Sequence, residues 1–352
     1  MMLDPILDIF RGKAVTIPPL DGAFRPNTLL DDAPDFADLT EPDNLLVADG
    51  RLMASSGNAV YTAAAAGAPT MVETFPSRVT ALALSPAGEL TVGLESGKLL
   101  IAGKEAPLPA EIRCITALAY AADGALWLAN GSAEHAPSEW AADLMKKGAS
   151  GSLWKREPAG SEFRKVAGDI AFPYGLHPAG KDVLVSESWR HQLVRFDGAT
   201  GSRSTVLAHL PGYPARLSPA ADGGAWLTLF APRNRLIEFV LQETHYRNDM
   251  LTQVPPQHWI APALASNRSF LEPLQCGGIR TMGIHKPWSP SRSYGLVVKL
   301  DRDMQPQHSL HSRANGTRHG ICSAMERDGR LFIASKGGDC LLAIDLASGG
   351  HR

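Results

Sequence analysis

Apolar and polar residues along this chain repeat in one simple order: a turn of small or Asp-Gly residues, followed by a strand with alternating apolar residues. A short turn flanked by alternating apolar residues is a strong local signal for a β-hairpin. Most copies also follow a short apolar stretch, which supplies the other strand of the hairpin. The six copies are ADGRLMAS (48–55), PAGELTVG (86–93), ADGALWLA (122–129), AGKDVLVS (179–186), DGGAWLTL (222–229) and RDGRLFIA (327–334).

The spacing of these hairpins predicts how they assemble. Hairpins that recur at intervals of ~40 residues and cannot bury their own faces stack radially into a β-propeller. We therefore predict an all-β, six-bladed β-propeller that spans 1–352 as a single domain. The last blade shows three strands, 320–325, 331–335 and 340–345. We expect the lone extended segment KAVTIP (13–18) to supply its outer strand, because this pairing closes the ring and removes exposed edges.

Two insertions interrupt the spacing of the repeat. The first, about 130–151, has Pro137 before an apolar pattern that predicts a short helix. The second, about 232–292, opens with a proline and apolar spacing that favour a helix over a strand. The segment 294–300 then resumes as a strand. Both insertions leave the propeller from equivalent hairpins, so we expect them to form a cap over one face and ligands to bind there.

Composition and charge exclude several classes of function. With 44% hydrophobic residues, 20% charged residues and a net charge of −2, the chain is typical of a globular protein, and no nucleic-acid partner is expected. Asp4 and Asp8 interrupt the only apolar stretch at the N-terminus, which predicts no signal peptide. No apolar run approaches the ~18–20 residues that span a bilayer, so we expect no membrane partner and a cytoplasmic location. The four cysteines lack CxxC spacing, which argues against a disulfide framework and a zinc site.

Three groups of motifs carry a family resemblance. They are FPYGL with VLVSES, LPGYPARL with DGGAWLTLFAPRN, and YGLVVKLD with SLHSRANG and ERDGRLFIAS. In residue types and order they resemble the strictosidine synthase-like proteins, six-bladed propellers related to the gluconolactonase and paraoxonase groups. The resemblance covers about 40–346 and implies the same propeller fold, with caps at the two insertions.

The resemblance also implies where a metal would lie. Lactonases and esterases of the wider group hold a divalent cation, usually calcium, in the central tunnel through a carboxylate of blade one and Asn or Asp side chains of other inner strands. At the matching positions this chain has Asp43, Asn44, Thr116, Tyr174 and Arg216. Calcium takes ~6–8 oxygen ligands, and this set holds one carboxylate. We therefore expect no bound metal and no other cofactor.

The founding plant enzyme of the family uses a tunnel glutamate in blade six to move protons during condensation of an amine with an aldehyde. By position that glutamate falls on Cys322, so strictosidine synthesis is not expected. Inner strands contribute residues to the tunnel where they begin, which defines a candidate site. Its members are Asp43, Asn44, Arg78, Thr116, Tyr174, Arg216, His319 and Cys322.

Each of the sharpest candidates has two interpretations. Arg216 would bind a substrate carboxylate through two hydrogen bonds, or would form a structural ion pair with Asp43 across the axis. Cys322 and His319 would form a nucleophile and its base if His319 lies in the loop before the strand; otherwise the thiol is buried and inert. Tyr174 would donate a proton to the substrate, or would fill the volume of the absent metal.

We predict an enzyme that acts on a small organic molecule, with a carboxylate-bearing substrate as one option. Arg216, assisted by Asp43, Asn44, Arg78 and Thr116, would hold the substrate. Ester or lactone hydrolysis is the reaction class that the family analogy suggests. The alternatives are a lyase, isomerase or condensing enzyme that uses Tyr174, His319 or Cys322, and a non-catalytic binding or sensor propeller. Nothing in the sequence defines the oligomeric state.

Overall fold

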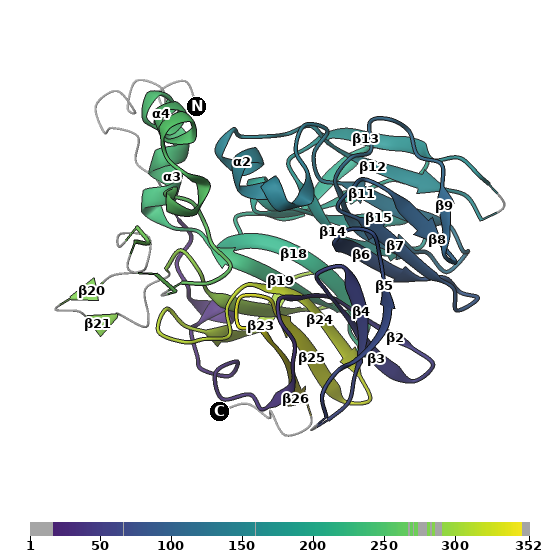
Figure 1. The fold of residues 1–352 in the computed structure, drawn as a ribbon, viewed down its shortest axis with the longest axis horizontal. Coiled ribbons are helices and arrows are strands. Elements are labelled where there is room, and N and C mark those ends of the chain that lie inside the picture. Colours follow the sequence, from purple (N-terminus) through teal and green to yellow (C-terminus); the bar gives the residue numbers. More distant parts are fainter. Residues whose placement is uncertain are drawn as a thin grey trace.

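Six antiparallel sheets of four strands each form the body of the protein (Figure 1). This computed structural model describes residues 17–65, 67–158, 160–266, 268–269, 271–273, 280–281, 284–285 and 291–346. Each of the six predicted turn-and-strand repeats lies in a different sheet. The six-bladed β-propeller predicted from the repeats is confirmed.

The first three blades follow the chain order. They are β2 (Pro42–Ala48), β3 (Arg51–Ser56), β4 (Ala59–Ala63) and β5 (Thr70–Thr74); β6 (Val79–Leu84), β7 (Leu90–Leu94), β8 (Leu99–Ile101) and β9 (Lys104–Ala106); and β10 (Ile115–Tyr120), β11 (Leu126–Asn130), β12 (Gly151–Arg156) and β13 (Arg164–Ile170).

The next two blades and the last one complete the ring. They are β14 (Pro173–Ala179), β15 (Asp182–Glu187), β16 (Gln192–Phe196) and β17 (Arg203–Leu207); β18 (Gly212–Pro219), β19 (Ala225–Pro232), β22 (Gly295–Leu300) and β23 (Pro306–Ser312); and β24 (Ile321–Arg327), β25 (Arg330–Ser335), β26 (Cys340–Asp345) and β1 (Asp35–Asp38).

The ring closes through the N-terminal part of the chain, but with a different segment from the one predicted. Strand β1 (Asp35–Asp38) pairs with β26 and is the outer strand of blade six. Residues 13–16 of the predicted strand lie outside the described residues, and 17–18 are not in a strand. The prediction failed because a four-residue strand such as DFAD buries only Ala37 and therefore leaves almost no alternating pattern in the sequence.

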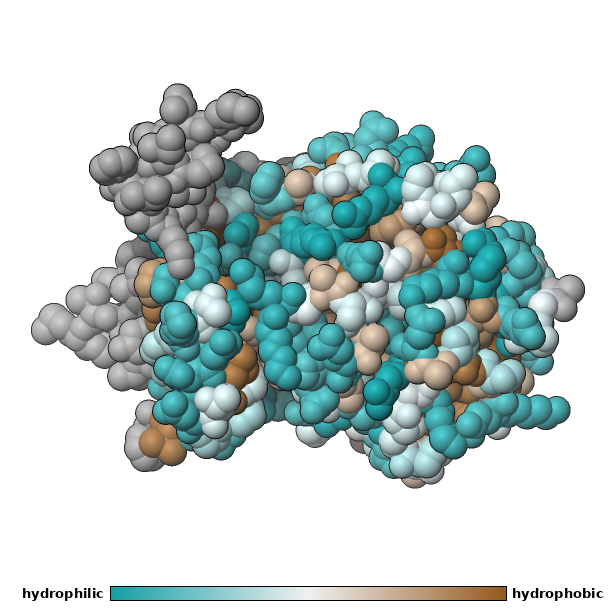
Figure 2. Space-filling model, turned by 90° about the horizontal axis from the view of Figure 1, so that it is seen from above, coloured by the Kyte–Doolittle hydropathy of each residue, from teal (hydrophilic) through white to brown (hydrophobic). Residues whose placement is uncertain are grey.

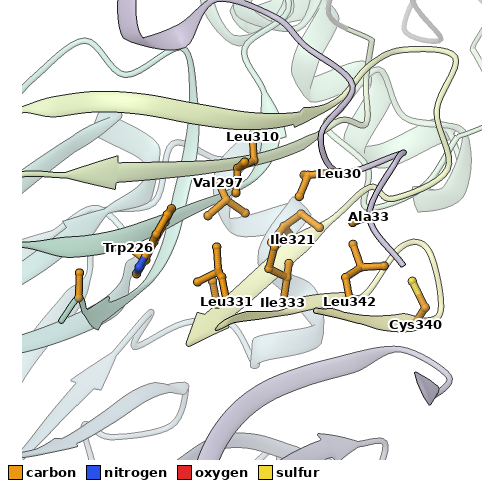
Figure 3. Packing of buried hydrophobic residues seen from close by; sticks show 12 residues of the cluster. Leu30, Ala33, Trp226, Val297, Leu310, Ile321, Leu331, Ile333, Cys340 and Leu342 are labelled. Carbon is orange, nitrogen blue, oxygen red and sulfur yellow. The ribbon is translucent and has the colours of Figure 1, made fainter. Parts of the chain in front are cut away.

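The blades are held together by apolar layers between neighbouring sheets. Figure 3 shows one of them, in which Trp226 and Val297 of blade five meet Ile321 and Ile333 of blade six. Leu30, which precedes β1, is fully buried in the same layer. This packing fixes the segment that leads into the closing strand.

All six inner strands share an irregularity near their first residues. In β2, β6, β10, β14, β18 and β24 the register with the second strand shifts by one residue, and in β18 it shifts twice in opposite directions. A β-bulge leaves its extra residue outside the ladder and redirects its side chain. The residues skipped by the pairing are Asp43, Asn44, Thr80, Thr116, Tyr174, Ala215, Arg216 and Cys322.

The α-helices found among the described residues lie in the two insertions. The first forms η2 (Pro137–Glu139) and α2 (Trp140–Met145), and the second forms α3 (Arg235–Gln242) and α4 (Thr244–Gln253), followed by η4 (Pro256–His258) and the short strands β20 (Arg280–Thr281) and β21 (Ile284–His285). The helical interpretation of both insertions is confirmed. The Asn234 side chain caps α3 by accepting the Leu236 N–H at 2.9 Å. In Figure 1 the three helices lie together at one side of the molecule, and α4 contacts both α2 and α3.

Two further short 3-10 helices are η1 (Gly22–Phe24) and η3 (Ser188–Arg190). None of the helices among the described residues is long and apolar enough to cross a membrane.

Figure 2 shows mostly hydrophilic residues on the coloured part of the surface, with hydrophobic residues in small scattered groups. A broad apolar face is therefore not present in that view of the described residues.

Candidate functional site

A cavity of about 220 Å³ lies where the cap meets the starts of the inner strands. Phe172 and Phe230 of the propeller and Trp140 of the first insertion form its apolar wall, and Leu264 of the second insertion adds to it. The Trp140 and Phe230 rings meet edge to face, with centroids 5.3 Å apart. The polar lining residues are Glu41, Asp43, Arg78, Thr80, Glu95, Thr116, Ser138, Tyr174 and Lys336.

The polar floor of this cavity is a carboxylate held between two cations. Arg216 Nη1 donates to Asp43 Oδ1 at 2.5 Å, and Lys336 Nζ donates to Asp43 Oδ2 at 2.5 Å. The side chains of Arg216, Asp43 and Lys336 are only 12%, 10% and 14% exposed. Both oxygens of Asp43 are therefore engaged, and the group carries one excess positive charge.

Burial and neighbouring charges shift the pKa values of these three groups in opposite directions. Burial alone would raise the pKa of Asp43, but the charges of Arg216 and Lys336 and their hydrogen bonds lower it to about 2. Burial alone would lower the pKa of Lys336 and of Arg216, but the Asp43 charge raises both. All three groups stay ionised at neutral pH, so Lys336 is an ammonium donor and Asp43 is a very weak base.

Arg216 extends from blade five across the axis of the tunnel. Its Nη2 donates to the backbone oxygen of Thr80 at 2.7 Å and to that of Thr116 at 3.3 Å. Its guanidinium carbon lies 4.9 Å from the centre of the Tyr174 ring. The predicted ion pair of Arg216 with Asp43 is present. Nη1 and Nη2 are therefore engaged by the protein itself, whereas Nε is buried without a hydrogen-bond partner among the described residues.

A second cavity of about 490 Å³ opens at the other end of the tunnel. Arg216 lines this cavity but not the capped one, while Asp43 lines the capped one only. Asn44 also faces the second cavity, and its backbone N–H and side-chain amide both donate to Ser55 Oγ, at 3.1 and 2.9 Å. The Arg216 guanidinium therefore lies at the boundary between the two cavities.

Tyr174 and Cys322 lie beside this group. The Cys322 thiol donates to the Gly320 backbone oxygen at 3.4 Å. Burial, together with the Asp43 charge, raises the pKa of Cys322 to about 11, and burial raises the pKa of Tyr174 well above its usual range. Both therefore stay protonated at neutral pH, and Cys322 is not an activated thiolate.

Gly175, the last residue of the FPYG motif, lies where two inner strands approach each other closely. A Cβ atom on Gly175 would lie 2.4 Å from the Ala215 backbone oxygen, so only glycine allows β14 and β18 to come this close. The approach places Tyr174 against the Arg216 guanidinium.

His319 does not serve Cys322 in this arrangement. Its Nδ1 lies 2.8 Å from Ser293 Oγ and its Nε2 lies 2.8 Å from the Arg313 backbone oxygen. The ring stacks on Tyr294, with an interplanar angle of 18°. Both ring nitrogens are engaged, so neither is available to accept a proton from the thiol.

The two remaining predicted residues line the capped cavity. Thr116 Oγ1 donates to the Pro173 backbone oxygen at 2.5 Å, which ties blade three to blade four. Arg78 pairs with Glu41 at 3.0 Å near the mouth, where both side chains are more than 40% exposed (42% and 44%). Such an exposed pair contributes little to stability.

The sequence reasoning missed Lys336, Thr80 and Glu95. Thr80 occupies in VTALAL the place that Thr116 occupies in ITALAY, so comparing the repeats would have found it. Lys336 and Glu95 directly follow the second strands of their blades, β25 and β7, and only inner-strand starts had been considered. Glu95 Oε1 accepts the Ser138 N–H at 3.0 Å, and its Oε2 is buried without a hydrogen-bond partner among the described residues.

The residues at the tunnel centre do not fit the calcium ion that the family resemblance implies. Calcium lies 2.3–2.6 Å from ~6–8 oxygen ligands, whereas each oxygen of Asp43 already has a cationic nitrogen at 2.5 Å. Across the described ranges, no three His, Cys, Asp or Glu side chains are grouped so that they could hold a metal ion.

Comparison with known proteins supports the fold. No protein-family model matches the sequence, and no curated protein matches it. Among solved structures, a gluconolactonase from Xanthomonas campestris is similar with a TM-score of 0.55 and 16% identity, covering 94% of each chain. A protein provisionally named a gluconolactonase is similar with a TM-score of 0.54 and 15% identity, covering 89% of this chain and 91% of that one. At these identities the likeness concerns the propeller fold alone.

Proposed function

We propose that this chain hydrolyses a small lactone or ester in the capped cavity, with the Lys336 ammonium as the group that binds the carbonyl oxygen. One observation carries the proposal: the Lys336 side chain, only 14% exposed, lines the cavity, and the one hydrogen bond of its ammonium group among the described residues goes to Asp43. An ammonium group has three N–H donors, so two remain for a ligand.

A positive donor at this point would stabilise the charge that develops on the carbonyl oxygen when water attacks the carbonyl carbon. Glu95 is the second group in the proposed reaction, because it lines the same cavity and has one unpaired carboxylate oxygen. It would accept a proton from the attacking water. The bond between the carbonyl carbon and the leaving oxygen then breaks, and the leaving oxygen takes the proton, which yields an acid and an alcohol.

The size and lining of the cavity limit the substrate. At about 220 Å³ it is smaller than the ~300–1,000 Å³ of pockets for drug-sized ligands. Its walls are aromatic, so a single-ring lactone or a short aryl ester fits best. The similarity to gluconolactonases and the motifs that resemble strictosidine synthase-like proteins support this reaction class as an analogy of fold.

The test is a panel of five- and six-membered lactones and aryl esters, with and without a carboxylate substituent, followed by acid release in a pH-stat. The wild-type protein is expected to turn over at least one member. Lys336→Met should lower kcat/KM by ~10²–10³-fold, which is typical for loss of a donor to the developing oxyanion. Lys104→Met, at an exposed lysine of β9, is the matched control and should have no effect.

The alternative function is binding without turnover. It is favoured by the low pKa of Asp43, about 2, which makes this carboxylate a poor general base. If ligands of the panel bind with a measurable Kd but none is hydrolysed faster than in buffer, the hydrolase proposal is wrong and the binding function replaces it. The lyase, isomerase and condensing alternatives receive less support, because His319 is engaged elsewhere and Tyr174 and Cys322 stay protonated.

A further inference from the structure

The centre of the tunnel contains converging oxygen atoms that are all bonded to Arg216. They are Asp43 Oδ1 at 2.5 Å, the Thr80 backbone oxygen at 2.7 Å and the Thr116 backbone oxygen at 3.3 Å. These acceptors come from blades one, two and three, and each belongs to a residue that its inner-strand bulge leaves outside the ladder. Carboxylate and carbonyl oxygens converging from several strands are the ligands of a hard cation.

The other oxygen of Asp43 is bonded to Lys336 at 2.5 Å. Two cations and one carboxylate leave an excess of one positive charge in a region that is nearly closed to water. A divalent cation would be repelled by this charge, and it would need positions around Asp43 that the two nitrogens already hold. The oxygen atoms are therefore bonded to cationic side chains of the chain itself, Arg216 and Lys336.

We propose that Arg216 and Lys336 form a built-in cation centre that replaces a bound metal ion in the tunnel of this propeller. Unlike a metal ion, this centre cannot dissociate or be removed by a chelator. Because the Arg216 guanidinium separates the two cavities, it also restricts a ligand of the capped cavity to entry from the capped side. This inference goes beyond the proposed hydrolysis and does not depend on it, because its test reads cation binding and stability.

The first experiment measures calcium binding to the wild-type protein by titration calorimetry, metal analysis after dialysis, and Tm with millimolar calcium or chelator. We expect no bound calcium above background and no change in Tm in either direction. One calcium ion per chain that raises Tm and is lost in Asp43→Asn would overturn the proposal.

The second experiment removes the built-in cations. In the double variant Arg216→Ala with Lys336→Ala, the freed oxygens should bind calcium and stabilise the folded state. With calcium at ~100 times its Kd the unfolding equilibrium constant should fall about 100-fold. Adding Asp43→Asn to the double variant should abolish the response. A folded double variant that ignores calcium contradicts the proposal.

A single variant covers the case in which the double variant does not fold. Arg216→Ala should be restabilised by millimolar methylguanidinium, which carries the group that was removed. Arg195→Ala, at an exposed arginine of β16, is the matched control and should not respond. If methylguanidinium leaves the Tm of Arg216→Ala unchanged, no cation position exists at this point and the inference is wrong.

Discussion

Replacing Asp43 by Asn should destabilise the protein far more than replacing an exposed aspartate. The substitution keeps the size of the side chain but leaves Arg216 and Lys336 buried without a counter-charge. Removing one partner of a buried ion pair typically costs about 3–5 kcal/mol. The pKa of Asp43 gives an independent value: it lies at about 2 instead of the ordinary 3.8, and at 1.36 kcal/mol per pKa unit the ionised carboxylate contributes about 2 kcal/mol at neutral pH.

The matched control is Asp345→Asn. Asp345 pairs with Arg330 at 2.7 Å, but the side chains of Asp345 and Arg330 are 59% and 38% exposed. Exposed pairs contribute about 0–1 kcal/mol. Urea denaturation at pH 7 with equal m-values measures both costs, and we expect Asp43→Asn to lose at least 2 kcal/mol more than the control, given the range of ~3–5 kcal/mol for buried pairs.

The pH dependence supplies a second readout. Because the pKa of Asp43 is lower in the folded protein than in the unfolded chain, its contribution is complete well above pH 3.8 and is lost as the pH falls toward about 2. The difference in unfolding free energy between the wild-type protein and Asp43→Asn should therefore shrink below about pH 4. Equal costs for the two variants at pH 7, or a difference that does not change with pH, would refute the reasoning.

Three further outcomes are expected. Cys322, with a pKa raised to about 11 by burial, should resist iodoacetamide at pH 8 in the folded protein and react after unfolding, as read by mass spectrometry; labelling in the folded state would contradict this. His319→Ala should lose about 1–3 kcal/mol through its bonds to Ser293 and Arg313, without changing the labelling of Cys322. Thr80→Val should be neutral or stabilising in urea denaturation, because the buried Thr80 hydroxyl has no hydrogen-bond partner among the described residues. A decrease of more than about 1 kcal/mol in the unfolding free energy would contradict this and would show that the hydroxyl forms a hydrogen bond.

Much of the fold could be predicted because the same pattern of turn and strand occurs six times in the sequence. A turn and an alternating strand, seen six times, indicate six sheets even where one copy is weak. The closing strand Asp35–Asp38 could not be found in this way, since it is short, occurs once and pairs with β26, roughly 300 residues away. A local sequence pattern predicts a strand, but it does not predict which distant strand pairs with it.

The candidate site was predicted in part for a similar reason. Asp43, Thr116 and Tyr174 all lie next to Arg216 because inner strands begin at the same end of the tunnel, which the repeat implies. Lys336 could not be placed, because it follows a second strand and its contact with Asp43 depends on ring closure. The ion pair of Arg216 was one of two interpretations, and only the geometry of its acceptors decides between them.

The closing strand also has a consequence for biosynthesis. Strand β1 leaves the ribosome roughly 300 residues before its partner β26. At ~5–20 residues per second, about 15–60 s pass before the ring can be sealed. During that interval the edge of the unfinished propeller is open to other unpaired strands. Pairing of this open edge with another strand would compete with closure of the ring until β26 has been made.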